Sequence, residues 1–466
     1  MIRVALPRGD LRTPLAERLI AAGFVAEGYS EGSRNYRFTV DGRPEVMVRV
    51  FADRDIPIQV ALGQYDLGIT SGVWVDELLA RYRHDSIVTL RALDVGAAQL
   101  VMAGAAGADV AARAAAGTMR VATEYPNLAT YYLNGLRMPD YRVFTVWGQA
   151  EAWPPEDAEL AVCPARAADA EGLSTLAVVQ AGSARLIGNR EAITSSGLQQ
   201  ALEPLMRLPA AEANDPIAEP VALQLNGSRR GLAPVQRSTL RIAVPDGHAQ
   251  RHTYASLTDA GIRFDGYDES NAGRRPASGI EGVEVKVLRP QDMPVAVALG
   301  LYDLALTGRD WLASHQASFP TSPVEELLDL GRSRYQLGAV VPDDLPVETI
   351  GEAIDYWRRD DPQRAIRVAS EYVPLADHYA RECHLGRYRV IPISGASEGF
   401  VPDDAEILIE GVETGETMRA NRLRMIDVIM ESTSCVIGSP TRPQGRRGEL
   451  RDALITRLRS GVKASD

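Results

Sequence analysis

The sequence is poor in the residues that build thiolate, metal and nucleic-acid sites. Its 466 residues include three cysteines and six histidines. Cys163, Cys383 and Cys435 have no paired spacing, so they suit a reducing compartment and predict no thiolate metal site. His378 and His384 are near in sequence but lack a ligand spacing. The net charge of −12 argues against a nucleic-acid partner, because the nucleic-acid backbone demands a positive surface.

Long apolar runs are also missing. No run approaches the roughly 20 residues that a membrane-spanning helix needs. The opening segment, MIRVALPRGD, leads straight into a strand-like run without the basic and apolar regions of a signal peptide. We therefore expect a cytoplasmic protein with no membrane association. The negative net charge does not exclude a small anionic ligand, because a local arginine cluster can overrule the global field.

An internal repeat covers nearly the whole chain. The matches occur in the same order in both halves, and their offset grows from about 238 to about 250 residues. The matched segments are Arg3–Pro7 with Arg241–Pro245, Pro57–Leu67 with Pro294–Leu304, Arg120–Tyr125 with Arg367–Tyr372, Tyr141–Val143 with Tyr388–Val390, and Ile187–Gly188 with Ile437–Gly438. We predict a tandem duplication, with a first copy at 1–207, a linker at 208–238 and a second copy at 239–466.

Each copy alternates short strand-like runs with helical patterns, which is typical of an α/β fold with a mostly parallel sheet. In the first copy, Arg3–Leu6 and Asp66–Ile69 predict strands and Leu11–Ala22 predicts a helix. Leu173–Gln180 is interpreted as a late helix that, with Ala184–Ile187, returns the chain to the first lobe. Two lobes joined in this way leave a cleft where strand ends face helix N-termini, and ligands bind at such places.

The second copy contains the most informative run of the chain. An apolar strand at Ile407–Ile409 ends at Glu410 and Glu413, and a small-residue loop follows, Thr414-Gly415-Glu416-Thr417. Backbone N–H groups at a helix start favour a phosphate, and the threonine hydroxyls add donors. Gly415 lets the backbone approach closely. The acids lie where they can hold ribose hydroxyls or a Mg²⁺ shared with pyrophosphate. A simple capping turn is the alternative interpretation.

This run resembles the phosphoribosyl-diphosphate loop of the ATP phosphoribosyltransferase family, the short-form catalytic domain of histidine biosynthesis. Other segments fall in the family's order. They are Leu6-Pro-Arg-Gly9, Tyr65-Asp-Leu-Gly-Ile-Thr70, Thr123-Glu-Tyr-Pro-Asn127 and Arg289-Pro-Gln-Asp-Met-Pro294. The resemblance covers both copies and leaves out the linker. It implies two tandem two-lobed units of the type II periplasmic-binding-protein-like class.

The family reaction joins N1 of ATP to C1 of phosphoribosyl diphosphate and requires Mg²⁺. The resemblance assigns phosphoribosyl-diphosphate binding to Glu410, Glu413, Thr414, Gly415, Glu416 and Thr417. It assigns nucleotide binding to Arg8 and Gly9, and catalytic roles to Arg289 and Arg34. It names ATP and phosphoribosyl diphosphate as substrates. Short-form members also work with a regulatory partner related to histidyl-tRNA synthetases. No covalent nucleophile is needed, since positioning and charge neutralisation suffice.

Each copy departs from the family pattern at a different place. The first copy has Cys163-Pro-Ala-Arg-Ala-Ala-Asp-Ala-Glu171 where the second has its phosphate loop, and Ala52 matches Arg289. The second copy has Asp246 at the position of Arg8. An acid at this position is expected to repel a phosphate.

Two interpretations follow. In one, the copies form an intramolecular pseudo-dimer with one composite site, and Arg34 and Arg8 of the first copy complete the second copy's cleft. In the other, the chain is an inactive paralogue that binds a phosphorylated ligand or regulates a separate phosphoribosyltransferase. Simpler roles stay open for single residues. Arg8 can cap local carbonyls, Arg34 can be a solvated loop residue, and Arg289 can merely precede a helix. Trp74 and Trp311 are interpreted as core residues.

Overall fold

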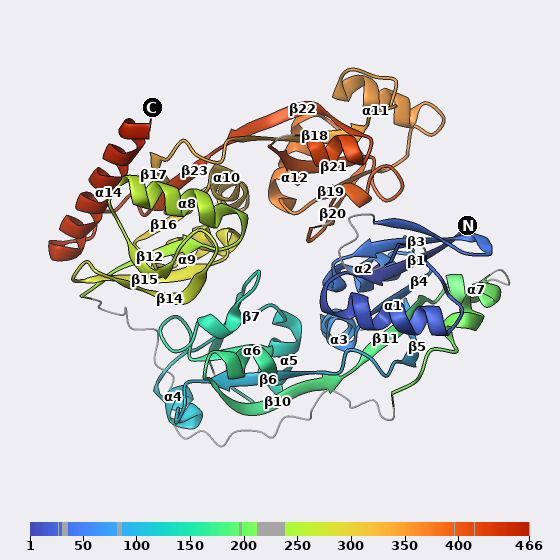
Figure 1. Cartoon of the computed structure of the whole chain (residues 1–466), viewed down its shortest axis with the longest axis horizontal. Coiled ribbons are helices and arrows are strands. Elements are labelled where there is room, and N and C mark those ends of the chain that lie inside the picture. The colour runs from blue at the N-terminus through green and yellow to red at the C-terminus, as the bar shows by residue number, and fades with distance from the viewer. Residues whose placement is uncertain are drawn as a thin grey trace. The chain divides into compact units, whose positions relative to one another are not determined.

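The chain is divided into two units that repeat one design. The computed structural model describes residues 1–466 except 27, 30–35, 82–85, 139, 195–197, 212–237, 396, 414 and 466. One unit consists of Met1–Ala233 together with Ile393–Gly399, and the other of Pro234–Pro392 together with Phe400–Asp466. In Figure 1 the first unit runs from blue to green, apart from its segment Ile393–Gly399, and the second from yellow-green to red. The main division point lies within the predicted linker.

The first lobe of the first unit is a six-stranded sheet with short helices. In spatial order its strands are β2 (Arg37–Val40), β3 (Arg43–Phe51), β1 (Ile2–Pro7), β4 (Leu67–Ser71), β11 (Ala184–Asn189) and β5 (Ile87–Ala92). Its helices are η1 (Gly9–Leu11), α1 (Arg12–Ala21), η2 (Asp53–Asp55), α2 (Ile56–Ala61), α3 (Gly72–Arg81), η4 (Ala192–Thr194) and α7 (Leu198–Leu205). β1 pairs in parallel with β3 and β4, whereas β11 is antiparallel to β4 and β5.

The second lobe of the first unit has five strands. Their order is β10 (Ser174–Gly182), β6 (Ala98–Gly104), β9 (Leu160–Pro164), β7 (Met119–Thr123) and β8 (Tyr141–Thr145). The helices are α4 (Val110–Ala116), α5 (Pro126–Gly135), η3 (Ala150–Ala152) and α6 (Ala165–Ala170). The chain enters this lobe from β5 into β6 and leaves it from β10 into β11. The two lobes are therefore joined by two crossing segments.

The second unit repeats this arrangement. Its first lobe has the strand order β15 (Val283–Leu288), β12 (Leu240–Pro245), β16 (Leu304–Gly308), β23 (Ser434–Gly438) and β17 (Glu325–Asp329), with a separate hairpin of β13 (Phe264–Tyr267) and β14 (Ala272–Ser278). Its second lobe has the order β20 (Tyr388–Pro392), β19 (Ile366–Ser370), β21 (Ile407–Val412), β18 (Tyr335–Pro342) and β22 (Leu423–Ser432). Apart from β2, each strand in the two sheets of the first unit has a counterpart in the sheets of the second unit.

The helices complete the second unit. Those of the first lobe are α8 (His248–Asp259), η5 (Pro290–Asp292), α9 (Met293–Ala298), α10 (Arg309–Ser318) and α14 (Gly445–Ser465). Those of the second lobe are α11 (Ile350–Arg358), α12 (Val373–Glu382) and α13 (Glu416–Ala420). The short η6 (Ser397–Gly399) belongs to the first unit. The duplication and the two-lobed α/β class predicted from the sequence are confirmed.

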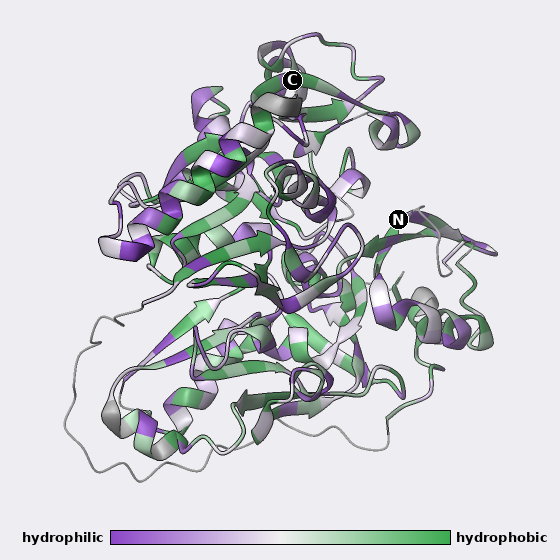
Figure 2. Cartoon of the chain, turned by 60° about the vertical axis from the view of Figure 1, so that its left-hand side comes forward, coloured by the Kyte–Doolittle hydropathy of each residue, from purple (hydrophilic) through white to green (hydrophobic). Residues whose placement is uncertain are grey.

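Among the described residues, each lobe has its own cluster of buried apolar side chains as a core. Figure 2 shows green, hydrophobic stretches along the strands and alternating green and purple along the helices. Such banding is what helices covering a sheet on one face produce. Among the described residues, no helix combines the length and the apolar character needed to cross a bilayer.

The prediction of a helix at Leu173–Gln180 is wrong, because this segment is strand β10. It pairs antiparallel with β6, with two irregularities in the register. Val179 is buried, whereas Leu176 and Val178 are each more than one third exposed. A half-buried strand normally alternates apolar and polar residues. In the edge strand β10 some apolar residues lie on the exposed face, so this alternation is lost and the sequence pattern resembles that of a helix.

Both units keep the same internal anchors. The Tyr29 hydroxyl donates to the Pro7 carbonyl at 2.6 Å, and the Tyr267 hydroxyl donates to the Pro245 carbonyl at 2.7 Å. In each case a buried tyrosine satisfies the last carbonyl of the strand that leads into the cleft. The anchors fix the end of β1 and the end of β12 in the same way.

A second shared anchor ties the start of a central strand to a buried acid. Glu159 accepts hydrogen bonds from the backbone and guanidinium of Arg120, and Glu406 accepts the same set from Arg367. Burial alone would raise the pKa of both carboxyl groups, but the hydrogen bonds from the arginines hold these pKa values below the usual range. These contacts position β7 and β19 beneath the clefts.

Candidate functional site

The strand–loop–helix unit predicted to hold a phosphate is present in the second unit. β21 ends at Val412, and α13 starts at Glu416 after Gly415, which adopts the left-handed conformation with φ of 69°. A glycine permits this turn without strain. Thr417 is exposed on the short helix α13. Asn421 caps the C-terminal end of this helix, and its side-chain amide donates to the Thr417 carbonyl. Thr414 lies outside the described residues.

The acids of this loop lie at different depths. Glu410 ends the buried part of β21, and its Oε1 accepts from the Gly411 amide at 3.0 Å. Glu413 is exposed, and its Oε2 lies 3.5 Å from Nε2 of His248. His248 begins α8 in the other lobe, so this contact joins the two lobes of the second unit. Glu416 is exposed at the first turn of α13.

Arg289 is paired with an acid of its own unit. Its Nη1 lies 3.3 Å from Oδ2 of Asp246, and the two side chains are 42% and 14% exposed. Asp246 occupies the position that Arg8 has in the first copy. The acid therefore neutralises the arginine that was predicted to meet substrate, and an incoming phosphate has to compete with it.

Arg8 and Gly9 lie at the end of β1 in the first unit. The Arg8 guanidinium donates to the Ser394 carbonyl at 2.6 Å, and Gly9 has a φ of 81° at the start of η1. Asp55 accepts from the Ser394 amide at 2.8 Å. Burial raises the pKa of Asp55 to about 6, against the opposing effects of Arg54 and of the Ser394 hydrogen bonds. Arg34 lies outside the described residues.

The first unit has lost the phosphate loop, and a tight turn replaces it. β9 runs through Pro164 directly into α6, with no left-handed residue at the junction. Arg166 of α6 forms an ion pair with Asp10 of η1 across the two lobes. By strand register Arg166 matches Glu413, and Asp10 matches His248. The same interlobe contact is thus made in both units, with the acid on the opposite lobe.

A cleft of about 1200 Å³ opens between the lobes of the first unit. Its lining includes Arg8, Asp53, Trp74, Tyr125 and Ser183. A volume of this size accommodates a small organic ligand. The copy without the phosphate loop therefore has a cleft large enough for a ligand.

Small residues keep this cleft open. Val73, Ala98 and Gly182 line it, and Ala98 lies directly opposite Gly182 in the sheet. In the second unit Tyr335 lies opposite Ser432 at the same register position. Asp310 takes the place of Val73, one residue before the matched tryptophans. The second unit thus carries polar side chains at all three positions, and those of Tyr335 and Ser432 are larger than their counterparts.

These polar side chains bond to one another. Asp310 is fully buried and accepts from the Tyr372 hydroxyl at 2.7 Å and the Ser432 hydroxyl at 2.8 Å. Tyr335 makes a further side-chain hydrogen bond to Asp310. Burial, together with the neighbouring Asp310, raises the pKa of both tyrosines well above the usual value. This cluster is satisfied internally, as a buried polar network has to be.

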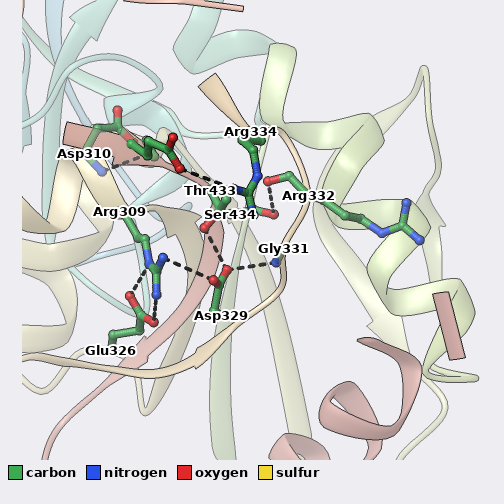
Figure 3. A network of polar contacts seen from close by, with 11 residues as sticks. Arg309, Asp310, Glu326, Asp329, Gly331, Arg332, Arg334, Thr433 and Ser434 are labelled. Carbon is green, nitrogen blue, oxygen red and sulfur yellow. Dashed lines mark hydrogen bonds and ion pairs between the residues drawn. The ribbon is translucent and has the colours of Figure 1, made fainter. Parts of the chain in front are cut away.

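An adjoining network ties α10 to the sheet (Figure 3). Arg309 donates to Glu326 at 2.6 Å and pairs with Asp329 at 3.1 Å. Asp329 in turn accepts from Thr433 and from the Gly331 amide. Arg309 matches Gly72 of the first unit, so this network is another addition of the second copy.

Sequence reasoning did not identify the Asp310 cluster or the open cleft. The signal is present in the sequence, because aligning the two copies places the polar Asp310, Tyr335 and Ser432 opposite Val73, Ala98 and Gly182. Trp74 was interpreted as a core residue. It packs on Tyr125 with ring centroids 4.4 Å apart, and it also lines the cleft.

The Mg²⁺ implied by the resemblance fits an ion that arrives with substrate. Within the described part of the chain, no group of three or more His, Cys, Asp or Glu side chains forms a metal site. Mg²⁺ commonly needs only one or two carboxylates when phosphates supply further ligands. Glu410 and Glu413 are the carboxylates available beside the loop.

Comparisons with known proteins identify one family. The family model for HisG, ATP phosphoribosyltransferase, matches residues 52–208 and 289–460, one segment in each copy. The ATP phosphoribosyltransferase of Saccharolobus solfataricus is 31% identical over 232 residues, covering 48% of this chain and 73% of that protein. The ATP phosphoribosyltransferase of Chlorobium phaeovibrioides is 29% identical over 206 residues, covering 43% of this chain and 63% of that protein.

Two solved structures are also similar. The ATP phosphoribosyl transferase (HisG:HisZ) complex from Thermotoga maritima aligns with a TM-score of 0.39 and 17% identity, over 48% of this chain and 100% of that chain. The periplasmic aliphatic sulphonate binding protein SsuA from Escherichia coli aligns with a TM-score of 0.30 and 12% identity, over 49% of this chain and 73% of that chain.

Proposed function

This chain belongs to the ATP phosphoribosyltransferase family, and from that premise we propose that it transfers the phosphoribosyl group of phosphoribosyl diphosphate to N1 of ATP. The supporting observation is the β21–loop–α13 unit of the second copy, which retains the acids, the left-handed Gly415 and Thr417 of the family motif. The first copy lacks this loop. We therefore propose that the chain has one catalytic site, centred on the second copy.

In this proposal the loop binds the phosphates of phosphoribosyl diphosphate. Backbone N–H groups at the start of α13 and the hydroxyls of Thr414 and Thr417 donate to phosphate oxygens. Glu410, at the end of β21, accepts from ribose hydroxyls. Arg289 neutralises charge on the leaving pyrophosphate once phosphate displaces Asp246 from it.

The bond changes need no protein nucleophile. The N1 lone pair of ATP forms a bond to C1 as the bond from C1 to the pyrophosphate oxygen breaks, and the bonding pair leaves with pyrophosphate. Mg²⁺, bound to the pyrophosphate with Glu410 or Glu413, would supply charge neutralisation. The residues of the chain orient the two substrates and exclude water.

The proposal includes a composite site of an intramolecular pseudo-dimer. Arg34 and Arg8 of the first copy then serve the second copy's chemistry, with Arg8-Gly9 contacting the nucleotide. A regulatory subunit and a cytoplasmic location, both expected from the resemblance and the sequence, belong to the same proposal.

Two observations favour a second candidate function. Arg289 is held by Asp246, and the buried Asp310 cluster occupies positions that are open in the first copy. Both features oppose binding of a large anionic substrate pair in the second unit. The second candidate is therefore a non-catalytic paralogue that binds a phosphorylated ligand or regulates a separate phosphoribosyltransferase.

Product formation distinguishes the two. The full chain is mixed with ATP, phosphoribosyl diphosphate and Mg²⁺, and phosphoribosyl-ATP is measured by mass spectrometry. The Thr414→Ala/Thr417→Ala variant is compared with Thr441→Ala, an exposed threonine in the turn before α14. Product from the parent and from Thr441→Ala, with none from the loop variant, supports catalysis in the second copy. Absence of product from the folded parent at high protein concentration contradicts it and favours the second candidate.

A further inference from the structure

We propose that the cleft of the first unit is a binding site for a protonated organic amine, which pairs with Asp53 and packs against Trp74. This ligand differs from the substrates of the proposed phosphoribosyl transfer, although Arg8 of the cleft lining also belongs to that proposal. Among the described residues of the lining, Asp53 is the carboxylate without a paired cation, and the volume and the walls of the cleft suit an amine.

Asp53 lines the cleft at the start of η2. Its Oδ1 accepts from the Thr70 hydroxyl at 2.7 Å and from the Ser71 amide at 2.9 Å. Among the described residues, no arginine, lysine or histidine pairs with this carboxylate. The other oxygen, Oδ2, receives neither of these hydrogen bonds. Oδ1 is therefore fixed by the fold, and in this proposal Oδ2 accepts from the ligand.

A carboxylate in a partly buried position is costly when no cation accompanies it. Burial raises the pKa of Asp53, and the hydrogen bonds from Thr70 and Ser71 only partly oppose this rise. The other two carboxylates of the lining have cations of their own. Asp10 pairs with Arg166, and Asp94 pairs with Arg18. A ligand ammonium would give Asp53 the positively charged partner that an arginine gives to Asp10 and to Asp94.

The aromatic wall suits the same class of ligand. The rings of Trp74 and Tyr125 lie 4.4 Å apart, and both residues line the cleft. Aromatic faces attract organic cations, and tryptophan does so most strongly. Val73 and Leu100 add apolar lining. In a molecule with an ammonium group and an apolar body, the ammonium would therefore pair with Asp53 and the body would pack against the aromatic and apolar lining.

Ser183 supplies a polar group that the fold leaves unused. The residue is 7% exposed and lines the cleft, and its Oγ is buried without a hydrogen-bond partner among the described residues. Buried hydroxyls are normally partnered. A second polar group of the ligand would satisfy it.

Anionic ligands are matched less well. Of the two guanidinium groups in the lining, Arg8 donates to the Ser394 carbonyl and Arg166 pairs with Asp10. The phosphate loop is absent from this copy. An anion entering the cleft would also meet the unpaired charge of Asp53.

The amine site is specific to the first copy. Position 53 corresponds to Pro290 in the second unit, and position 73 corresponds to Asp310. The second unit therefore lacks the carboxylate at one position and has an internally bonded acid in place of an apolar side chain at the other.

The test measures binding of 2-phenylethylamine to the full chain by isothermal titration calorimetry. 3-Phenylpropionate, which has a similar shape and the opposite charge, is the anionic counter-probe. We expect the amine to bind and the carboxylate not to bind. Asp53→Asn, which is isosteric, weakens amine binding on the order of tenfold or more because the ion pair is lost. Asp94→Asn, at a paired carboxylate of the rim, leaves it unchanged.

Ala98→Tyr/Gly182→Ser, which places the second copy's residues in the first, is expected to abolish amine binding. Thermal unfolding verifies that each variant is folded, and Asp53→Asn provides the decisive comparison if the double variant is not. The proposal is overturned if the amine fails to bind at millimolar concentration. It is also overturned if Asp53→Asn binds the amine as tightly as the parent, or if 3-phenylpropionate binds more tightly than the amine.

Discussion

The clefts of the two units differ at matched positions. In the first unit, Val73, Ala98 and Gly182 leave a cavity of about 1200 Å³, and the phosphate loop is absent. In the second unit, Asp310, Tyr335 and Ser432 bond to one another at those positions, and the loop is retained. The first copy thus has small or apolar residues where the second has a bonded polar cluster, and of the two copies the second keeps the phosphate loop. Shared anchors such as Tyr29 and Tyr267 show that this divergence left the fold intact.

The largest effect is expected for Asp310→Val in the second unit. The change removes the acceptor of three hydroxyl groups and should lower the free energy of unfolding by about 3 kcal/mol. The matched change Val73→Ala in the first unit should cost about 1 kcal/mol. Hydrogen–deuterium exchange on peptides of each unit measures both. Equal protection in the parent and Asp310→Val would mean that the cluster is not a structural part of the second unit.

A smaller effect is expected for the paired acids Glu406 and Glu159. Glu406→Gln should cost the second unit about 2 kcal/mol, and Glu159→Gln should cost the first unit somewhat less, because its side chain is 11% rather than 3% exposed. Both native pKa values are lowered, so this stability is present above the unfolded pKa of about 4.5 and is lost as pH falls through the lowered native pKa. Denaturation at pH 7 and at acidic pH tests this, and an unchanged acid dependence in the variants would contradict it.

Asp246→Asn sharpens the comparison of the two N-terminal segments. It releases Arg289, and phosphoribosyl diphosphate should bind several-fold more tightly, a gain of about 1 kcal/mol. Titration calorimetry provides the measurement. Asp265→Asn, an exposed acid of β13, is the control and should change nothing. Weaker binding to Asp246→Asn would show that Asp246 assists the substrate instead of competing with it.

The smallest effect belongs to the inverted interlobe pairs. Asp10→Ala and His248→Ala should each change stability by less than about 0.5 kcal/mol, because the paired side chains are largely exposed. A double-mutant cycle of Asp10 with Arg166 measures the coupling. Asp10→Arg/Arg166→Asp should restore it. A coupling energy well above about 0.5 kcal/mol would contradict this prediction and would show that the pair stabilises the contact between the lobes.

The sequence predicted the duplication, the family and the two-lobed fold, because ordered matches and strand–helix alternation depend on many residues at once. It failed at Leu173–Gln180, where exposed Leu176 and Val178 imitated a helix. It identified Asp246 as an anomaly but not its ion pair with Arg289, since the contact depends on the end of β12 meeting the end of β15. The Asp310 cluster was equally hidden, because its four members come from separate elements that only the sheet register brings together.

The segment Ile393–Gly399 has a consequence for synthesis of the chain. It belongs to the first unit, where Ser394 meets Arg8 and Asp55, and Gly399 accepts from the buried Arg49. A ribosome finishes residues 1–233 long before it reaches this segment. The emerging first unit therefore remains incomplete, with the guanidinium of Arg49 lacking this acceptor, until most of the second unit has been translated. Folding of the first unit can therefore be completed only after this segment of the second half has been translated.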